Sequence, residues 1–205
     1  MSTDKAKSKR QKAKIVLRSL LVITLFLPGC GKPFNVKPRP DTPPHVAGAS
    51  ATVSSIALEA EAVKDEDYLY DTFEANLLMA GVLPVRVRIA NRGTEPVSLK
   101  KSRFEVRSDE PRAYKAITAG EAFNRVFSFY GISVYSKSGY RESKDDFLSH
   151  AIDLNSPLAG GESREGLMFF PVPDDITRRP GLKLVARRLR SGEKKSDSAI
   201  ELKLN

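Results

Sequence analysis

The chain has 205 residues, a formal net charge of +9 and one cysteine. A single cysteine excludes an internal disulfide, so apolar burial must hold the folded part together. Residues 1–29 carry seven of the cations and one anion, which leaves +3 for the remainder. The basicity therefore belongs mostly to the first segment, and nucleic-acid binding, which a high overall pI would suggest, loses most of its support.

The first 29 residues have the layout of a secretion signal. A cationic start is followed by an apolar run over residues 20–27 and then by Pro28 and Gly29. Positive charge keeps such a start on the cytoplasmic side, and the run is far shorter than the roughly 20 apolar residues that span a bilayer. We predict a signal peptide over residues 1–29 and no permanent transmembrane helix.

The signal ends in Leu27-Pro28-Gly29-Cys30. Leu-x-Gly-Cys at this place resembles the lipobox of bacterial lipoproteins, in which the cysteine is lipidated and becomes the mature N-terminus. The resemblance implies membrane attachment through lipidated Cys30 in the bacterial cell envelope. The outer membrane is favoured over the inner, because Gly31 replaces the aspartate that retains lipoproteins at the inner membrane. Lipoboxes usually carry Ala, Ser or Thr where Pro28 stands, so ordinary cleavage to a secreted protein is the alternative.

Residues 30–50 are rich in proline and poor in apolar side chains. Such a segment favours extended polyproline geometry, which rises about 3.1 Å per residue and does not pack. We predict a proline-rich tether over residues 30–50, which would lift a single domain, residues 51–205, away from the membrane.

Alternating apolar and polar residues predict several β-strands. In residues 82–90, four apolar residues are expected to face inward while Arg86 and Arg88, between them, face outward, which is the pattern of a strand with one buried face. The expected strands are residues 56–62, 82–90, 97–106, 166–173, 182–186 and 200–204. Residues 91–96 have turn chemistry and predict a hairpin between the strands on either side. The pattern favours a mainly β fold, an antiparallel immunoglobulin-like β-sandwich with short helical insertions.

The helical insertions are predicted from caps and apolar periodicity. A short helix is expected after Asp71 or Thr72, and residues 118–121 have the form of a capping box at the start of a second helix. Ser143 is expected to cap a third. Residues 131–139, between the second and third helices, are predicted to form a loop.

Residues 80–91, which end in Asn91, resemble a core strand of immunoglobulin-like domains in bacterial envelope lipoproteins. The turn at residues 158–162, followed by the apolar residues 166–173, resembles a second part of such domains. The similarity covers most of residues 51–205, and its motifs are structural. It implies a fold and no reaction.

Histidine chemistry gives little support for catalysis. His150 follows Ser149, but neighbours on a helix point about 100° apart and do not meet as a catalytic pair. We expect His150 to be a half-exposed helix residue. With one cysteine and no cluster at ligand spacing, we predict no metal site, no cofactor and no enzyme.

Two surfaces are candidates for recognition. Tyr130, Tyr135 and Tyr140 surround the predicted loop, and such aromatic residues suit protein or sugar contacts, although tyrosines also seal the ends of sheets. A basic stretch predicts a patch for anionic lipid or envelope polysaccharide, and its alternative is an edge strand protected by charge. The patch consists of Arg178, Arg179, Arg187, Arg188 and Arg190.

Together these features predict a lipid-anchored envelope protein that acts as a binding or scaffolding module. The predicted partners are the membrane and an envelope protein or polysaccharide, and no nucleic acid. The alternatives are a secreted inhibitor or chaperone-like protein that uses the tyrosine-rich loop and, less favoured, an envelope hydrolase.

Overall fold

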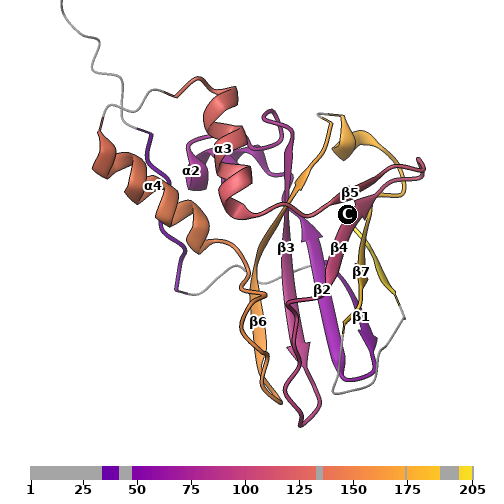
Figure 1. Ribbon diagram of the computed structural model, residues 1–205. Helices are drawn as coiled ribbons and strands as arrows, with labels where there is room; N and C mark the ends of the chain where they lie inside the picture. The colour runs from indigo at the N-terminus through magenta and orange to yellow at the C-terminus, as the bar shows by residue number, and fades with distance from the viewer. Residues whose placement is uncertain (1–33, 42–47, 133–135, 174, 190–198, 205) are drawn as a thin grey trace, which may run out of the picture. The chain divides into compact units, whose positions relative to one another are not determined.

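The computed structural model describes residues 34–41, 48–132, 136–173, 175–189 and 199–204, which contain two four-stranded antiparallel sheets (Figure 1). The strands are β1 (Ala49–Val53), β2 (Ile56–Ala62), β3 (Val82–Asn91), β4 (Arg103–Arg107), β5 (Ala113–Lys115), β6 (Ser163–Pro171), β7 (Lys183–Arg187) and β8 (Ile200–Lys203). One sheet has the order β1-β2-β3-β6 and the other β5-β4-β7-β8. The prediction of a mainly β, antiparallel sandwich with short helical insertions is confirmed.

The likeness to immunoglobulin domains lies in architecture and not in strand order. β2 and β3 pair with each other in one sheet, whereas immunoglobulin topology places its second and third strands in opposite sheets. The predicted hairpin after β3 is wrong: Val97 forms an isolated bridge with Leu158, and the chain crosses to the other sheet before β4 begins. The polar residues Lys100 and Lys101, with no apolar face to bury, lie in this crossing.

The core between the sheets follows the alternation that the sequence predicts. On β3, Leu83, Val85 and Val87 are buried inside the sandwich, while Arg86 on the outer face pairs with Glu61 of β2 at 3.1 Å. Period-two alternation puts successive side chains on opposite faces of a sheet. The sandwich is therefore apolar between the sheets and charged outside.

Three helices cover the outer face of the first sheet at one end (Figure 1): α2 (Glu66–Phe73), α3 (Ala119–Phe129) and α4 (Lys137–Ser149). Strand β6 is buried on both faces here. Leu167 and Phe169 pack under the helices, while Met168 and Phe170 belong to the sandwich core. This explains the unbroken apolar run in β6, because each face of the strand meets a different core.

Of the three helix caps predicted from the sequence, only that of α3 is confirmed. The Thr118 hydroxyl accepts from the Glu121 amide at 3.2 Å and the Glu121 carboxylate accepts from the Thr118 amide at 2.8 Å, which confirms the capping box. α2 begins earlier than predicted because Asp65 caps it. Ser136 caps α4, so that this helix includes residues 137–139 of the predicted loop. No helix within the described ranges is both long and apolar enough to cross a bilayer.

Candidate functional site

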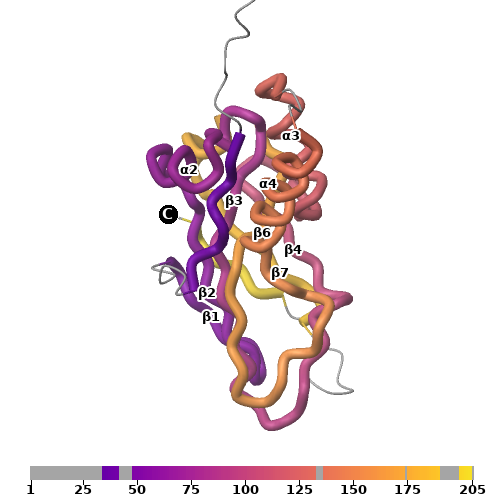
Figure 2. The backbone as a smooth tube through the Cα atoms, turned by 90° about the vertical axis from the view of Figure 1, so that its left-hand side faces the viewer, coloured from indigo at the N-terminus to yellow at the C-terminus, as the bar shows by residue number. Residues whose placement is uncertain are grey.

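Residues 34–41, named here the docked segment, pack against the domain and run between α2 and α4 (Figure 2). The ring of Phe34 lies 6.3 Å from that of Phe123, and Val36 is fully buried. The amide of Lys37 donates to the carbonyl of Thr72 at 2.8 Å. The prediction that residues 30–50 form an unpacked tether is therefore wrong for residues 34–41, because Phe34 and Val36 pack against the domain. β1 also begins inside the range predicted as tether.

His150, at the end of α4, holds the docked segment from the other side. Its Nε2 lies 2.9 Å from the Lys37 carbonyl, and since a carbonyl only accepts, Nε2 donates. The ring packs edge-on against Phe73 at 5.0 Å. Burial lowers the pKa of His150, and the nearby Arg39 lowers it further. His150 is buried and not half-exposed as predicted, and its role is structural.

Two further hydrogen bonds fix the ends of the docked segment. The Ser143 hydroxyl donates to the Phe34 carbonyl at 2.8 Å, so the residue predicted to cap α4 instead holds the incoming chain. Arg39 donates to the Glu165 carbonyl of β6 at 2.8 Å. The segment is therefore attached to both the helices and the sheet.

A cavity of about 620 Å³ lies beside β4 and β6, where the segments before α3 and after α4 cross. Its floor is apolar and includes Phe104, Ile152 and Phe169. A volume of this size falls in the usual range of ligand pockets, which are lined mostly by apolar groups with a few polar ones. We therefore take this cavity as the candidate site.

The rim of the cavity is basic. Lys100, Arg103 and Lys115 line it and are exposed. The carboxylate of Glu105 is also in the lining, but it binds Arg107 at 2.8 Å. An apolar floor under a cationic rim suits a ligand that has both an apolar part and a negative charge.

The hydroxyls in the lining already have partners. Ser102 donates to the Arg188 carbonyl at 3.4 Å, and Thr118 binds Glu121 in the helix cap. Both hydroxyls are thus hydrogen-bonded within the fold.

The segments beside the cavity also close the free edge of β6. Leu167 donates to the His150 carbonyl at 2.8 Å, and Ile152 donates to the Leu167 carbonyl at 3.1 Å. On the same strand, Ile117 donates to the Phe169 carbonyl at 2.8 Å. Glycine at position 166 lets the segment after α4 pass close to β6, because a Cβ there would lie 2.6 Å from the Ile152 nitrogen.

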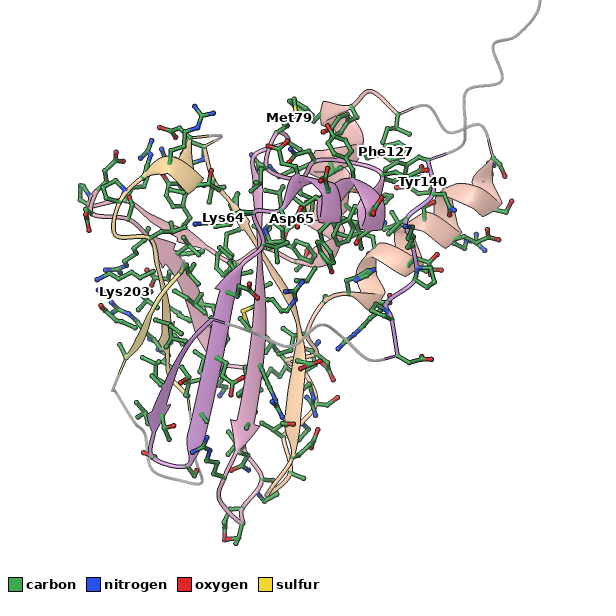
Figure 3. All side chains as sticks on the ribbon, turned by 180° about the vertical axis from the view of Figure 1, so that it is seen from behind. Lys64, Asp65, Met79, Phe127, Tyr140 and Lys203 are labelled. Carbon is green, nitrogen blue, oxygen red and sulfur yellow. The ribbon has the colours of Figure 1, made fainter. Side chains whose placement is uncertain are left out.

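Two of the three tyrosines of the predicted recognition loop, Tyr130 and Tyr140, have partners within the domain. Tyr140 lies in α4, and its ring packs edge-on against Phe127 at 5.2 Å (Figure 3). The Tyr130 hydroxyl accepts from the Asn76 amide at 3.0 Å and donates to the Asn76 carbonyl at 3.1 Å. Tyr135 lies outside the described residues.

The structure divides the predicted basic patch. Arg178 and Arg179 precede β7 whereas Arg187 and Arg188 lie at its far end, about 13 Å away at 3.3 Å per residue. Arg179 is neutralised by Asp175 at 3.0 Å and by Glu110. The edge-strand alternative is wrong, because β7 lies between β4 and β8.

At the opposite end of the sandwich, Asn91 joins two loops. Its side-chain nitrogen donates to the carbonyls of Glu95 at 2.7 Å, Leu158 at 3.2 Å and Ala159 at 3.1 Å. Its side-chain oxygen accepts from the Gly93 amide at 3.0 Å. Asn91 is fully buried. The hydrogen bonds of its side-chain amide therefore hold the two loops of this end together.

Three predicted site residues lie outside the part of the chain that the structure describes: Cys30, Tyr135 and Arg190. Within the described ranges, no group of three or more His, Cys, Asp or Glu side chains is placed to hold a metal ion.

The docked segment and the cavity were not predicted. Phe34 and Val36 alternate with polar residues, which is a weak strand-like signal inside a proline-rich stretch. Ser143 and His150, which bind the carbonyls of Phe34 and Lys37, lie more than a hundred residues away in the sequence. The cavity has no local signal, because its walls come from distant segments of the chain.

No family model and no curated protein matches this chain. Among solved structures, the chain is similar to the yjhA protein from Bacillus subtilis, with a TM-score of 0.44 and 14% identity over 78% of this chain and 99% of that chain. It is also similar to an uncharacterized β-sandwich protein from Clostridium difficile 630, with a TM-score of 0.37 and 10% identity over 85% of this chain and 99% of that one.

Proposed function

We propose that this chain is a lipid-anchored protein of the bacterial envelope whose sandwich domain acts as a binding module held close to the membrane. One observation carries the proposal: Phe34, only four residues after Cys30, already packs against Phe123 and is held by Ser143. Four residues of extended chain reach at most about 14 Å. A lipid on Cys30 would therefore hold the domain at the bilayer surface and not at the end of a long tether.

The cavity supports binding over catalysis. Its apolar floor and the exposed cations Lys100, Arg103 and Lys115 suit a partner that presents an apolar group beside a negative charge. An envelope protein or an amphiphilic anion has this chemistry, and a neutral polysaccharide has less of it. The proposed role is therefore to bind such a partner near the membrane.

The test combines lipid analysis with crosslinking in a bacterial host that processes lipoproteins. A photoreactive amino acid replaces Asn155, an exposed residue of the cavity lining, and in a matched control it replaces Thr94 at the opposite end. We expect a lipid on the N-terminal peptide at Cys30, membrane association that is lost in Cys30→Ser, and adducts from position 155 that position 94 does not form.

Each part of this proposal has its own contradicting result. An unmodified N-terminal peptide, or a Cys30→Ser variant that stays with the membrane as the wild type does, would remove the lipid anchor. Equal adducts from positions 155 and 94 would remove the cavity as the binding site.

A further inference from the structure

Three large apolar side chains stand in solvent at the helical end of the domain. Tyr70 is 44% exposed, and Met79 and Phe129 are each 53% exposed. Single exposed apolar residues are common on soluble proteins, whereas contiguous ones mark contact surfaces. The question is therefore whether these three side chains form one surface.

A chain of contacts joins them. The Tyr70 hydroxyl lies 3.9 Å from the Met79 sulfur, and the ring of Phe129 lies edge-on to that of Tyr130 at 5.0 Å. The Tyr130 hydroxyl binds the backbone of Asn76, three residues before Met79, and Phe129 lines one shallow hollow together with Ala80, the residue after Met79. Tyr70, Met79, Phe129 and Tyr130 thus form one surface, named here the terminal patch.

The terminal patch lies at the end where the chain enters the domain. Phe34, the first docked residue, lies 6.2 Å from Phe127 of α3, ring to ring. Phe129 follows two residues later, about 3 Å further along the helix axis. Figure 3 shows Met79, Phe127 and Tyr140 at this same end.

We infer that the terminal patch is a membrane-contact surface, on which the domain rests against lipid headgroups beside its anchor. The inference rests on the proposed lipid at Cys30, because the chain from Cys30 to Phe34 reaches at most about 14 Å. Tyrosine, phenylalanine and methionine suit this place, since aromatic rings with a polar edge favour the membrane interface.

This contact fixes the orientation of the domain. β3 runs away from the helical end for ten residues, or about 33 Å at 3.3 Å per residue. The loops that Asn91 joins therefore face away from the bilayer.

The charges around the terminal patch define the lipid. Glu66 lies one helical turn before Tyr70 on α2, and Glu121 lines a shallow hollow with Arg125 and Phe129. Both signs are present, so anionic lipid gains no net attraction. The surface fits zwitterionic headgroups, and its contact should depend little on salt or on anionic lipid.

The test measures depth in the bilayer at single positions of the lipidated full chain. Once its sulfur carries lipid, Cys30 does not compete for a thiol reagent, so one engineered cysteine takes an environment-sensitive fluorophore alone. The label goes to Met79→Cys in the terminal patch, to Leu148→Cys, an exposed apolar residue outside it, and to Thr94→Cys at the opposite end. The protein is placed in zwitterionic vesicles that contain spin-labelled lipid.

Quenching at position 79 should exceed that at 148 and 94 several-fold, because an interfacial contact buries apolar atoms about 5–10 Å deep. Equal quenching at all three positions, or stronger quenching at 94, would overturn the contact surface while the measured lipid mass leaves the anchor intact. Absence of lipid on Cys30 would overturn both proposals. Protection of position 79 without quenching would indicate a protein partner or second copy there and would also overturn the inference.

Discussion

The two cores of this domain are built from different side chains. Between the sheets the core is mostly aliphatic, whereas under the helices four fully buried phenylalanines meet. Phe147 lies at the centre, 5.2 Å from Phe73, 5.5 Å from Phe123 and 5.1 Å from Phe169, ring to ring. Helices of 8, 11 and 13 residues are marginal on their own, so large rings supply the area that holds them to β6.

This difference implies that the three helices are not stable without the sheet on which they pack. Two sheets that face each other at about 10 Å fill the space between them with the inward side chains of every strand. The helices instead depend on a few rings and on β6, whose alternate residues belong to the two cores. We therefore expect the two regions to unfold together.

The largest expected effect comes from removing one residue of each core. Phe147→Ala should lower the free energy of unfolding by about 3–5 kcal/mol and Leu83→Ala by about 2–5 kcal/mol, because both side chains are fully buried. Denaturant unfolding followed by circular dichroism should show one transition in both variants, with unchanged slope. A separate early transition in Phe147→Ala alone would show that the helical layer unfolds by itself.

A smaller effect is expected where hydrogen bonds and not rings hold the structure. Asn91→Ala leaves the carbonyls of Glu95, Leu158 and Ala159 without this donor, and should cost about 1–3 kcal/mol in free energy of unfolding. Asn155→Ala, an exposed position, is the control and should stay within about 0.5 kcal/mol of the wild type. Equal values for the two variants would mean that the loops do not depend on the buried amide.

The smallest effect tests the docked segment through pH. The pKa of His150 is lowered from 6.5 in the folded state mainly by burial and further by Arg39, and this outweighs the opposing effects of the hydrogen bond with the Lys37 carbonyl and of Asp146. Below pH 6.5 the unfolded chain therefore binds the proton more readily, so stability falls as pH decreases through this value and is unaffected above it.

His150→Gln keeps a neutral donor for the Lys37 carbonyl and does not titrate. Melting temperatures of the wild type and His150→Gln, measured from about pH 8 to about pH 5, should diverge only on the acid side, with the wild type losing more. Parallel curves would show that His150 does not titrate in a buried site.

The strands and the α3 cap were predictable because their signals are local. Alternation on β3 and the paired Thr118 and Glu121 need only neighbouring residues. α4 was predicted too short because Ser136 precedes a polar turn, whereas Ser143 looked like a cap but binds the docked segment. Its partner lies 109 residues away, and no local pattern reports such a distance.

The candidate site was less predictable than the fold for the same reason. Residues of the cavity come from the stretches near Phe104, Thr118, Ile152 and Phe169, which only the tertiary fold brings together. The tyrosines Tyr130 and Tyr140 were recognisable as a group, but their sequence does not reveal that their rings or hydroxyls are engaged in packing and backbone hydrogen bonds.

The crossing segments that cover β6 have a consequence for self-association. An open sheet edge is a template onto which another chain can add a strand, and crowding on a surface raises that hazard. Ile117 and Ile152 take the hydrogen-bonding positions of β6 that a second copy would use. The apolar run of β6 is thereby shielded from strand addition at the positions where its backbone would otherwise be available.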